Sequence, residues 1–311
     1  MRRLSGGVVG LLMTLPATAT ATYSIVAADA AAREVGGAVT SCVAPQSVDI
    51  VYRSVPGRGA MNTQATWVTL GSDRGVAMLE AGAAPAEVIA EITSSAFDSG
   101  FQSRQYGVAD LSGRAAGYTG VSTLAFSADR QGSMGSFVYS VQGNILTSVR
   151  VLDQAEAGFR ATGCDLAERL MLALEEGAQN GEGDSRCTTR YGIPSDASSI
   201  EVDRAGEEAG TYLRLAFTST ETVHEDPIVR LRGQFDAWRA THPCPTAGGA
   251  GGAGGSATSS GGGGVVASDD RGCGCRVGRR GSAGAWCIFA ASTAGAWLAR
   301  RRGRRGARSL L

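Results

Sequence analysis

The sequence of 311 residues predicts an α+β fold. Segments in which polar and apolar residues alternate, typical of β-strands, occur in blocks, and pairs of amphipathic helices lie between these blocks. Antiparallel strands and helix pairs arranged in this way bury their apolar faces as stacked layers. Without its two terminal segments the chain keeps about 220 residues, which suits one large domain.

The elements are expected in the order β-β-β-α-α-β-β-β-α-α, followed by two further strands. Gly82 is expected to end the first helix, and Ser72 or Asp73 to cap its start. The tripeptide Leu111-Ser-Gly separates two strands as a hairpin turn does. Predicted strands are 22–28, 35–43, 61–68, 105–110, 114–119, 137–146, 199–202 and 212–217, and predicted helices are 71–82, 85–96, 148–159 and 165–176.

A strand and a helix are expected to extend the domain from about residue 205 to residue 245. Pro227 suits the first turn of that helix. The helix has an apolar stripe, which usually packs against a core. The stripe consists of Ile228, Leu231, Phe235 and Trp238.

Residues 1–21 have the three parts of a secretory signal peptide. Arg2 and Arg3 supply the positive start, 8–15 the short apolar stretch, and Ala19-Thr20-Ala21 the small-residue cleavage site. Cleavage after Ala21 makes Thr22 the first mature residue, although cuts after Ala17 or Ala19 fit the same rule. A terminal Thr22 would carry both a hydroxyl nucleophile and a free α-amine that can act as its base.

Charge is unevenly distributed along the chain. Residues 22–245 contain 17 Arg and 27 Asp and Glu, a net charge of −10, whereas the remaining tail has a net charge of +8. An acidic domain argues against a nucleic-acid partner, because binding to phosphates depends on Arg and Lys. The chain contains no Lys, which excludes lysine-dependent chemistry.

Four of the seven cysteines lie in the domain: Cys42, Cys164, Cys187 and Cys244. An even number in an exported domain predicts two disulfides. Three pairings are possible, and we favour Cys42 with Cys187 and Cys164 with Cys244. The domain has no CxxC pair and only two histidines, His224 and His242, so its spacing matches no zinc motif and no Ser/His or Cys/His triad. No metal or other cofactor is expected.

The C-terminal region divides into two segments. Residues 246–272 form a Gly-rich linker, whose composition predicts disorder. Residues 273–311 contain Cys273-Gly-Cys275, an apolar stretch at 282–299 and an arginine cluster from Arg300 to Arg305. This tail resembles the myxobacterial C-terminal sorting signal, which implies export, display at the cell surface or outer envelope, and a sorting protease as partner. A permanent transmembrane anchor is the alternative.

Six motifs in the domain occur in a fixed order. They are Thr22-Tyr-Ser-Ile-Val-Ala-Ala-Asp29, Glu34-Val-Gly-Gly-Ala-Val-Thr-Ser41, Asn62-Thr-Gln-Ala65, Val141-Gln-Gly-Asn-Ile-Leu146, Leu166-Ala-Glu-Arg-Leu170 and Gly183-Asp-Ser-Arg186. Together they resemble, over about 22–203, a bacterial family of unknown function assigned to the N-terminal nucleophile (Ntn) hydrolase superfamily. The resemblance implies an αββα four-layer sandwich. The stretch from Tyr212 also looks like the start of an extension labelled peptidoglycan-binding in that family.

The resemblance implies that Thr22 attacks an amide carbonyl, with its own α-amine handling the proton. Structural roles are the alternatives: Gln64 could close a strand edge, Asn144 could form a turn, and Asp184 could pair with Arg186. The residues in the motifs nearest the reaction centre are Asp29, Gln64, Asn144, Asp153, Asp184 and Arg186.

One departure from the family concerns the residue after Ser41. Family members frequently carry a basic residue there, whereas this chain has Cys42, and no Lys is present to lower the pKa of the amine. The expected function is a secreted, surface-displayed Ntn-type amidohydrolase acting on a small amide, peptide or cell-wall fragment. The alternative is a catalytically silent envelope or surface binding protein on the same fold. A mature chain that starts anywhere but Thr22 favours the alternative.

Overall fold

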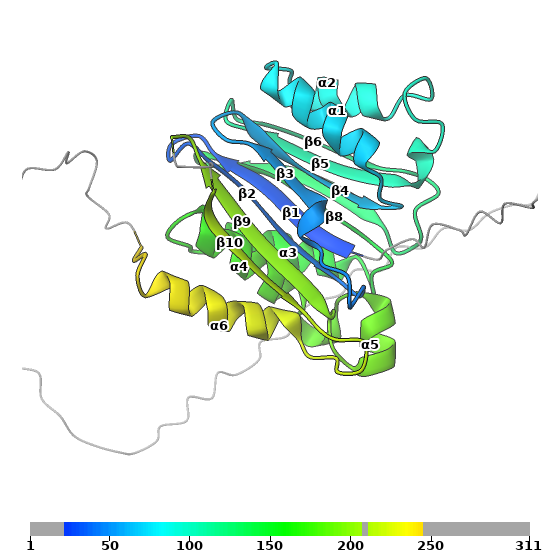
Figure 1. Ribbon diagram of the computed structural model, residues 1–311, viewed down its shortest axis with the longest axis vertical. Coiled ribbons are helices and arrows are strands. Elements are labelled where there is room, and N and C mark those ends of the chain that lie inside the picture. The colour runs from blue at the N-terminus through cyan, green and yellow to red at the C-terminus, as the bar shows by residue number, and fades with distance from the viewer. Residues whose placement is uncertain (1–21, 207–210, 245–311) are drawn as a thin grey trace, which may run out of the picture. The chain divides into compact units, whose positions relative to one another are not determined.

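The computed structural model describes residues 22–206 and 211–244 (Figure 1). These residues form two antiparallel sheets and six α-helices, which confirms the predicted α+β fold. The predicted signal peptide at 1–21, the linker at 246–272 and the tail at 273–311 lie outside the described residues. Within the described part of the chain, no helix combines the length and the apolar character that a membrane span requires.

The larger sheet has six strands in the order β10-β9-β2-β1-β8-β7, with β1 and β2 buried along their whole length. At Gly37 an added Cβ would lie 2.4 Å from the Tyr52 ring, so a glycine is needed where the second sheet approaches. The strands are β1 (Thr22–Asp29), β2 (Glu34–Ser41), β7 (Ala128–Met134), β8 (Phe137–Asn144), β9 (Ala197–Arg204) and β10 (Thr211–Thr218).

The smaller sheet has four strands in the order β3-β4-β5-β6. One face contacts β1 and β8 of the larger sheet, and α1 and α2 cover the other, burying Met61, Tyr106 and Ile92 (Figure 1). The elements are β3 (Tyr52–Val55), β4 (Gly59–Ala65), β5 (Arg104–Asp110), β6 (Arg114–Thr119), α1 (Thr69–Glu80), α2 (Pro85–Ile92), and the 3-10 turns at Asp49–Val51 and Phe101–Ser103.

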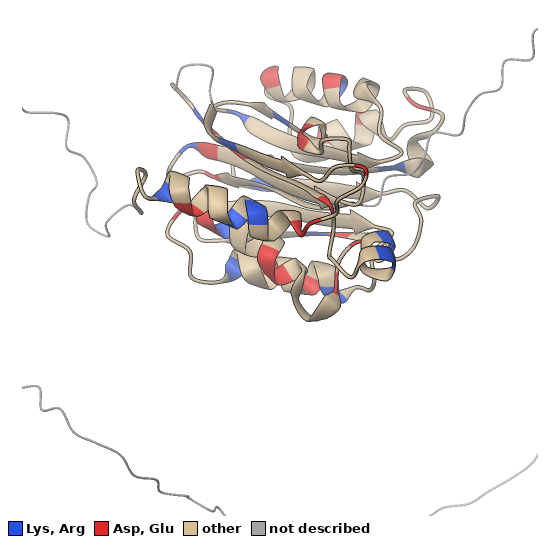
Figure 2. Cartoon of the chain, turned by 60° about the horizontal axis from the view of Figure 1, so that its bottom comes forward, with Lys and Arg blue, Asp and Glu red and all other residues tan. Residues whose placement is uncertain are grey.

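Three helices cover the outer face of the larger sheet: α3 (Arg150–Arg160), α4 (Leu166–Gly177) and α6 (Pro227–Arg239). The predicted stripe of α6 is confirmed, since Ile228, Leu231 and Phe235 are buried in this core and Trp238 packs against it. The colouring of Figure 2 shows that basic and acidic residues are interspersed along the helices of the domain. Arg232 of α6 pairs with Glu175 of α4, which fastens the last helix to the domain.

Two disulfides confirm the favoured pairing. Cys42, directly after β2, is bonded to Cys187 in the short helix α5 (Ser185–Tyr191). Cys164, directly before the cap of α4, is bonded to Cys244, beyond the end of α6. Each disulfide therefore joins two segments that are far apart in the sequence, by 145 residues for Cys42–Cys187 and by 80 residues for Cys164–Cys244.

Three elements were not predicted: β3, β7 and α5. The predicted start of the first helix is also wrong, because α1 begins at Thr69 and Val68 occupies the N-cap. Ser72 lies inside α1, fully buried, and donates to the Thr69 carbonyl. Gly82, with a φ of +89°, follows the helix end as predicted.

Alkaline pH is expected to destabilise the fold through its buried phenols. Burial, together with nearby carboxylates, raises the pKa of Tyr23 and Tyr52 well above 10, and burial raises the pKa of Tyr106 to about 12. Because the folded-state pKa values exceed the unfolded ones, the stabilisation is complete below about pH 10 and is lost as pH rises through the raised values.

An ultraviolet absorbance titration checks this expectation. Fewer than the seven tyrosines should ionise near pH 10, and the remainder should ionise only as far-ultraviolet circular dichroism reports unfolding. Tyr52→Phe should remove one late-ionising phenol. Ionisation of all seven in one step near pH 10, in a chain that stays folded, would contradict the expectation.

Candidate functional site

Thr22 is the first residue of β1, at one end of the larger sheet. The strand register places it between Ser41 of β2 and Asn144 of β8. Its Oγ1 donates to Ser41 Oγ at 3.2 Å, and the residue is 1% exposed. The residue that the sequence marks as a possible nucleophile therefore lies at the end of an interior strand, with a paired strand on each side.

Gln64 reaches Thr22 from the smaller sheet. Gln64 Nε2 donates to the Thr22 carbonyl at 3.3 Å and to Gln105 Oε1 at 2.7 Å, while Ser24 donates to Gln64 Oε1 at 2.6 Å. Gln64 is fully buried, so its amide connects the two sheets directly beside Thr22. At Gln64 the backbone of β4 pairs with β5, whereas the ladder with β3 ends at Asn62, so the Gln64 side chain adds contacts between the sheets at a point where β4 has one strand neighbour.

A closed ring of side-chain hydrogen bonds fills the space between the sheets next to this point. Hydroxyl, carboxylate and amide groups alternate in it, so buried polar atoms satisfy one another as burial requires. One side of the ring lies beside Thr22, and the opposite side includes Asp129 and the exposed Gln131 of β7. Its members are Ser24, Gln64, Gln105, Thr119, Asp129, Gln131, Ser140 and Gln142.

Asn144 presents an unused acceptor at the same end. Its Nδ2 donates to Gln105 Oε1 at 3.1 Å, whereas its buried Oδ1 has no hydrogen-bond partner among the residues that the structure describes. Native structures rarely leave such an atom unpaired without a reason. The Oδ1 of Asn144 is therefore available to accept a hydrogen bond from a donor group that is not part of the described chain.

Backbone strain is concentrated next to these amides. Ala65, directly after Gln64, has a φ of +70°, and Ile145, directly after Asn144, has a φ of +52°. Positive φ is unusual for alanine and rarer still for a β-branched residue. Such strain costs about 1–3 kcal/mol per residue and clusters at functional sites. Both strained residues lie where a strand ends beside Thr22.

Asp184 and Arg186 lie next to the C-terminal end of β2 and to the segment that follows β8. Asp184 is fully buried and caps α5, and its Oδ2 accepts from the Cys42 backbone N–H at 2.7 Å. Arg186 pairs with it at 3.0 Å, and Leu146 bridges to Asp184 through the backbone. The predicted salt bridge is thus present, and it joins the segment after β8 to the end of β2.

Two predicted residues lie away from Thr22. Asp29 is at the opposite end of β1, about 23 Å away at the rise of a strand, and its Oδ1 accepts from Ala31 N–H to shape a turn. Asp153 is on the outer helix α3, half exposed, and pairs with Arg130. The structure therefore brings together Thr22, Gln64, Asn144, Asp184 and Arg186, and separates Asp29 and Asp153 from them.

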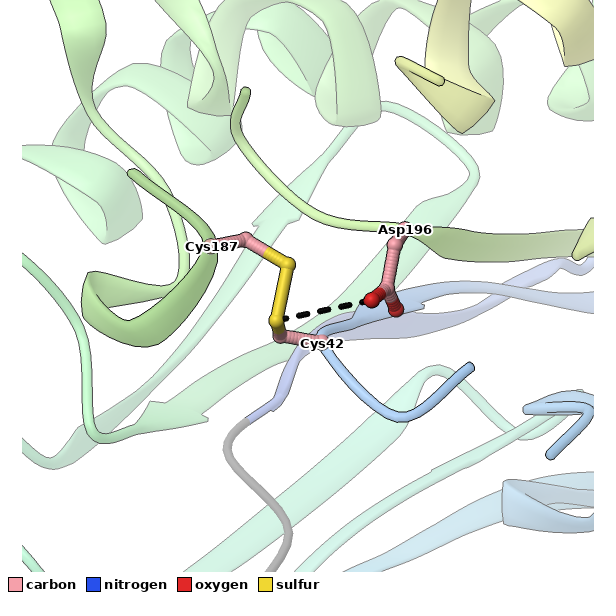
Figure 3. Close-up of side chains that lie close together, drawn as sticks. All are labelled: Cys42, Cys187 and Asp196. Atoms are coloured by element: carbon pink, nitrogen blue, oxygen red, sulfur yellow. Dashed lines mark hydrogen bonds between the residues drawn. A yellow bond between two sulfur atoms is a disulfide. The ribbon is translucent and has the colours of Figure 1, made fainter. Parts of the chain in front are cut away.

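Sequence reasoning missed a second polar cluster near the end of β2. Figure 3 shows Asp196 beside the Cys42–Cys187 disulfide. Asp196 Oδ2 is 3.3 Å from His224 Nδ1. Sequence patterns gave no signal for this cluster, because its four members come from four separate segments.

Comparison with known proteins agrees with this architecture at the level of a family. The chain belongs to DUF1028, a family of unknown function, whose model matches residues 22–225. A search of curated proteins finds no match.

A solved member of the same family is similar in fold: the protein SPO2555 from Silicibacter pomeroyi, with a TM-score of 0.57 and 22% sequence identity. The alignment covers 70% of this chain and 86% of that one. At this identity the likeness extends to the fold alone.

Proposed function

We propose that the domain is an Ntn-type amide hydrolase that uses Thr22 as its nucleophile. The observation that carries this proposal is the placement of Thr22 at the first position of the central strand, between Ser41 and Asn144 and held by Gln64. Two helices on one sheet and three on the other, with the sheets in contact, support an Ntn-like αββα sandwich.

Removal of residues 1–21 would create the reactive group. In the full chain the nitrogen of Thr22 belongs to a peptide bond with Ala21, and cleavage converts it to an α-amine. Asn144, the strand partner of Thr22, offers an unpaired Oδ1 that can accept a hydrogen bond from this amine and orient its lone pair toward the hydroxyl.

The reaction proceeds as two acyl transfers. Thr22 Oγ1 attacks the amide carbonyl carbon, its proton passes to the α-amine, and the amine protonates the leaving nitrogen as the C–N bond breaks. Water then attacks the carbonyl carbon of the threonine ester and gives a proton to the α-amine; the C–O bond to Thr22 breaks, the amine returns that proton to Oγ1, and the acid is released. Asp184 and Arg186 act as positioning residues, because they hold the end of β2 against α5.

Export and surface display are part of the proposal. The signal peptide and the tail support them, and so do the two disulfides, which form and persist outside the reducing cytosol. The substrate would be a small amide, a peptide or a cell-wall fragment reached at the cell surface or outer envelope, with a sorting protease acting on the tail.

A labelling experiment on secreted protein tests the nucleophile. N-terminal sequencing should give Thr22 as the first residue, and an electrophilic threonine-directed probe should form an adduct there, located by mass spectrometry. Thr22→Ser keeps a hydroxyl and should still be labelled, whereas Thr22→Val keeps the shape and should not. Labelling should rise with pH near about 7.7–8.0, as an α-amine deprotonates.

Two results would contradict the proposal. One is a mature chain that begins at Thr18 or Thr20, because the hydroxyl of Thr22 would then have no amine on the same residue. The other is equal labelling of the native chain and Thr22→Val. Either result leaves the silent binding protein as the better account.

A further inference from the structure

Four side chains with metal-binding atoms lie near the C-terminal end of β2. Cys42 follows β2, Cys187 lies in α5, Asp196 precedes β9, and His224 lies between β10 and α6. The ligand atoms of Cys42, Cys187 and Asp196 all lie within 4.8 Å of one another (Figure 3). This cluster is separate from the proposed nucleophile and does not depend on its activity.

The carboxylate of Asp196 is fixed with one oxygen facing the cluster. Oδ1 accepts from the backbone N–H groups of Val43 and Ala44 at 2.7 and 2.9 Å. Oδ2 contacts Cys42 Sγ at 3.6 Å and His224 Nδ1 at 3.3 Å. A disulfide sulfur carries no hydrogen, so the contact with Cys42 is not a hydrogen bond in the oxidised chain, and Oδ2 keeps lone pairs for another partner.

Packing against a neighbouring aromatic ring fixes the position of the His224 side chain. Its ring stacks on Tyr191 of α5 with centroids 3.7 Å apart, and its side chain is 15% exposed. With Nδ1 directed at Asp196, this nitrogen is available as a ligand when Nε2 carries the proton. Asp196 itself is 2% exposed, so a charge placed here is shielded from water.

Two of the six edges of a tetrahedral zinc site are already near the required length in the oxidised chain, while the edge between the two sulfurs forms only when their bond is broken. His224 approaches the cluster from the side of Asp196. With Zn–S of about 2.3 Å and Zn–N and Zn–O of about 2.0–2.2 Å, the S···O edge is about 3.6 Å and the N···O edge about 3.4 Å. The observed values of 3.6 and 3.3 Å fit both. Two Cys, one Asp and one His also form a closed set of four ligands of the types that zinc prefers.

We propose that reduction of the Cys42–Cys187 disulfide converts this cluster into a site for one Zn²⁺ ion. A dithiol reductant breaks the S–S bond, gives one hydrogen to each sulfur and is itself oxidised to a disulfide. The two thiols then bind zinc as thiolates and release two protons. Disulfide and zinc exclude each other, and each ties α5 to the end of β2 in its own redox state.

The remaining domain disulfide provides an internal control. The full chain is reduced anaerobically with a dithiol, the dithiol is removed, and cysteine alkylation is followed by peptide mass spectrometry with and without one equivalent of Zn²⁺. Zinc should slow alkylation of Cys42 and Cys187 at least tenfold and leave Cys164 and Cys244 unchanged. A chelator should restore the original rates.

Substitutions identify the other two ligands. Asp196→Asn and His224→Gln should each weaken zinc protection of Cys42 at least tenfold, whereas His242→Gln, which changes the only other histidine, should have no effect. Co²⁺ in place of Zn²⁺ should give the intense visible absorption of a tetrahedral thiolate site in the native chain, and His224→Gln should shift it.

The experiment also covers the case in which reduction of the disulfides unfolds the chain. If the reduced chain unfolds, zinc is added during its refolding from denaturant, and protection of Cys42 and Cys187 is measured in the product. Absence of protection in both formats overturns the proposal. Protection that survives both Asp196→Asn and His224→Gln also overturns it, because the metal would then be held elsewhere.

Discussion

Asp184→Ala is expected to lower the free energy of unfolding by about 3 kcal/mol, although residue 184 lies in a short loop before a seven-residue helix. The variant loses the cap of α5, the carboxylate that accepts from the half-buried Cys42 N–H, and the ion pair between Asp184 and Arg186. Hydrogen bonds to a buried carboxylate are stronger than neutral ones, so their loss outweighs an ordinary cap. Urea unfolding with the disulfides intact measures the change, which corresponds to about 6–12 °C in melting temperature.

Asp226→Ala is the matched control. Asp226 caps α6 through Ile228 N–H and Val229 N–H, but it is only half-buried and does not bind a distant segment. Its replacement should cost about 1 kcal/mol, the usual loss for an N-cap. Equal losses in the two variants would show that Asp184 is a cap and nothing more.

Gln105→Leu is expected to destabilise the domain by about 3–5 kcal/mol, despite a similar side-chain volume. Gln105 Oε1 accepts from Gln64 and Asn144, and its Nε2 donates to the carbonyls of Ala128 and Gly143. Leucine would remove all four of these hydrogen bonds from a largely buried network, in which the loss of a partner for a buried polar group costs about 1–3 kcal/mol. Chemical denaturation measures the loss, and probe labelling of Thr22 should fall because Gln64 loses its 2.7 Å hydrogen bond to Gln105 and is held less firmly beside Thr22.

Gln131→Leu tests whether position in the ring matters. Gln131 belongs to the same ring of hydrogen bonds, but it is exposed on β7, so water can replace its contacts. The substitution should cost about 1 kcal/mol or less. A loss as large as that of Gln105→Leu would mean that the ring is cooperative throughout.

Sequence patterns predicted those elements that supply long apolar segments to the core. Strands β1 and β2 and helix α4 were found because their apolar residues recur over many positions. β7 was missed because the sequence Ala-Asp-Arg-Gln-Gly-Ser-Met has few apolar residues and the strand lies at a sheet edge. α5 was missed because seven residues give too little pattern, and its place is fixed by a disulfide and a cap.

The candidate site was predictable only in part. Motif resemblance pointed to Thr22, Gln64 and Asn144, which come from three strands and meet through the strand register. The same reasoning included Asp29, because it belongs to the same motif as Thr22. That motif forms an eight-residue strand, so the two residues lie at its opposite ends. Gln105 and Asp196 could not be predicted, since only the packing of two sheets gives them their partners.

The position of β1 also bears on the order of events during maturation. Both neighbours of β1 pair with it from Thr22 to Asp29, so the ladder pairs that the structure describes all belong to residues that remain after the proposed cut. The proposed cleavage keeps these pairs, and we expect the precursor and the trimmed chain to share this sheet. Under the proposed function, the domain would complete this sheet as an inert precursor, and the cleavage that frees the α-amine of Thr22 would change its chemistry while these ladder pairs stay in place.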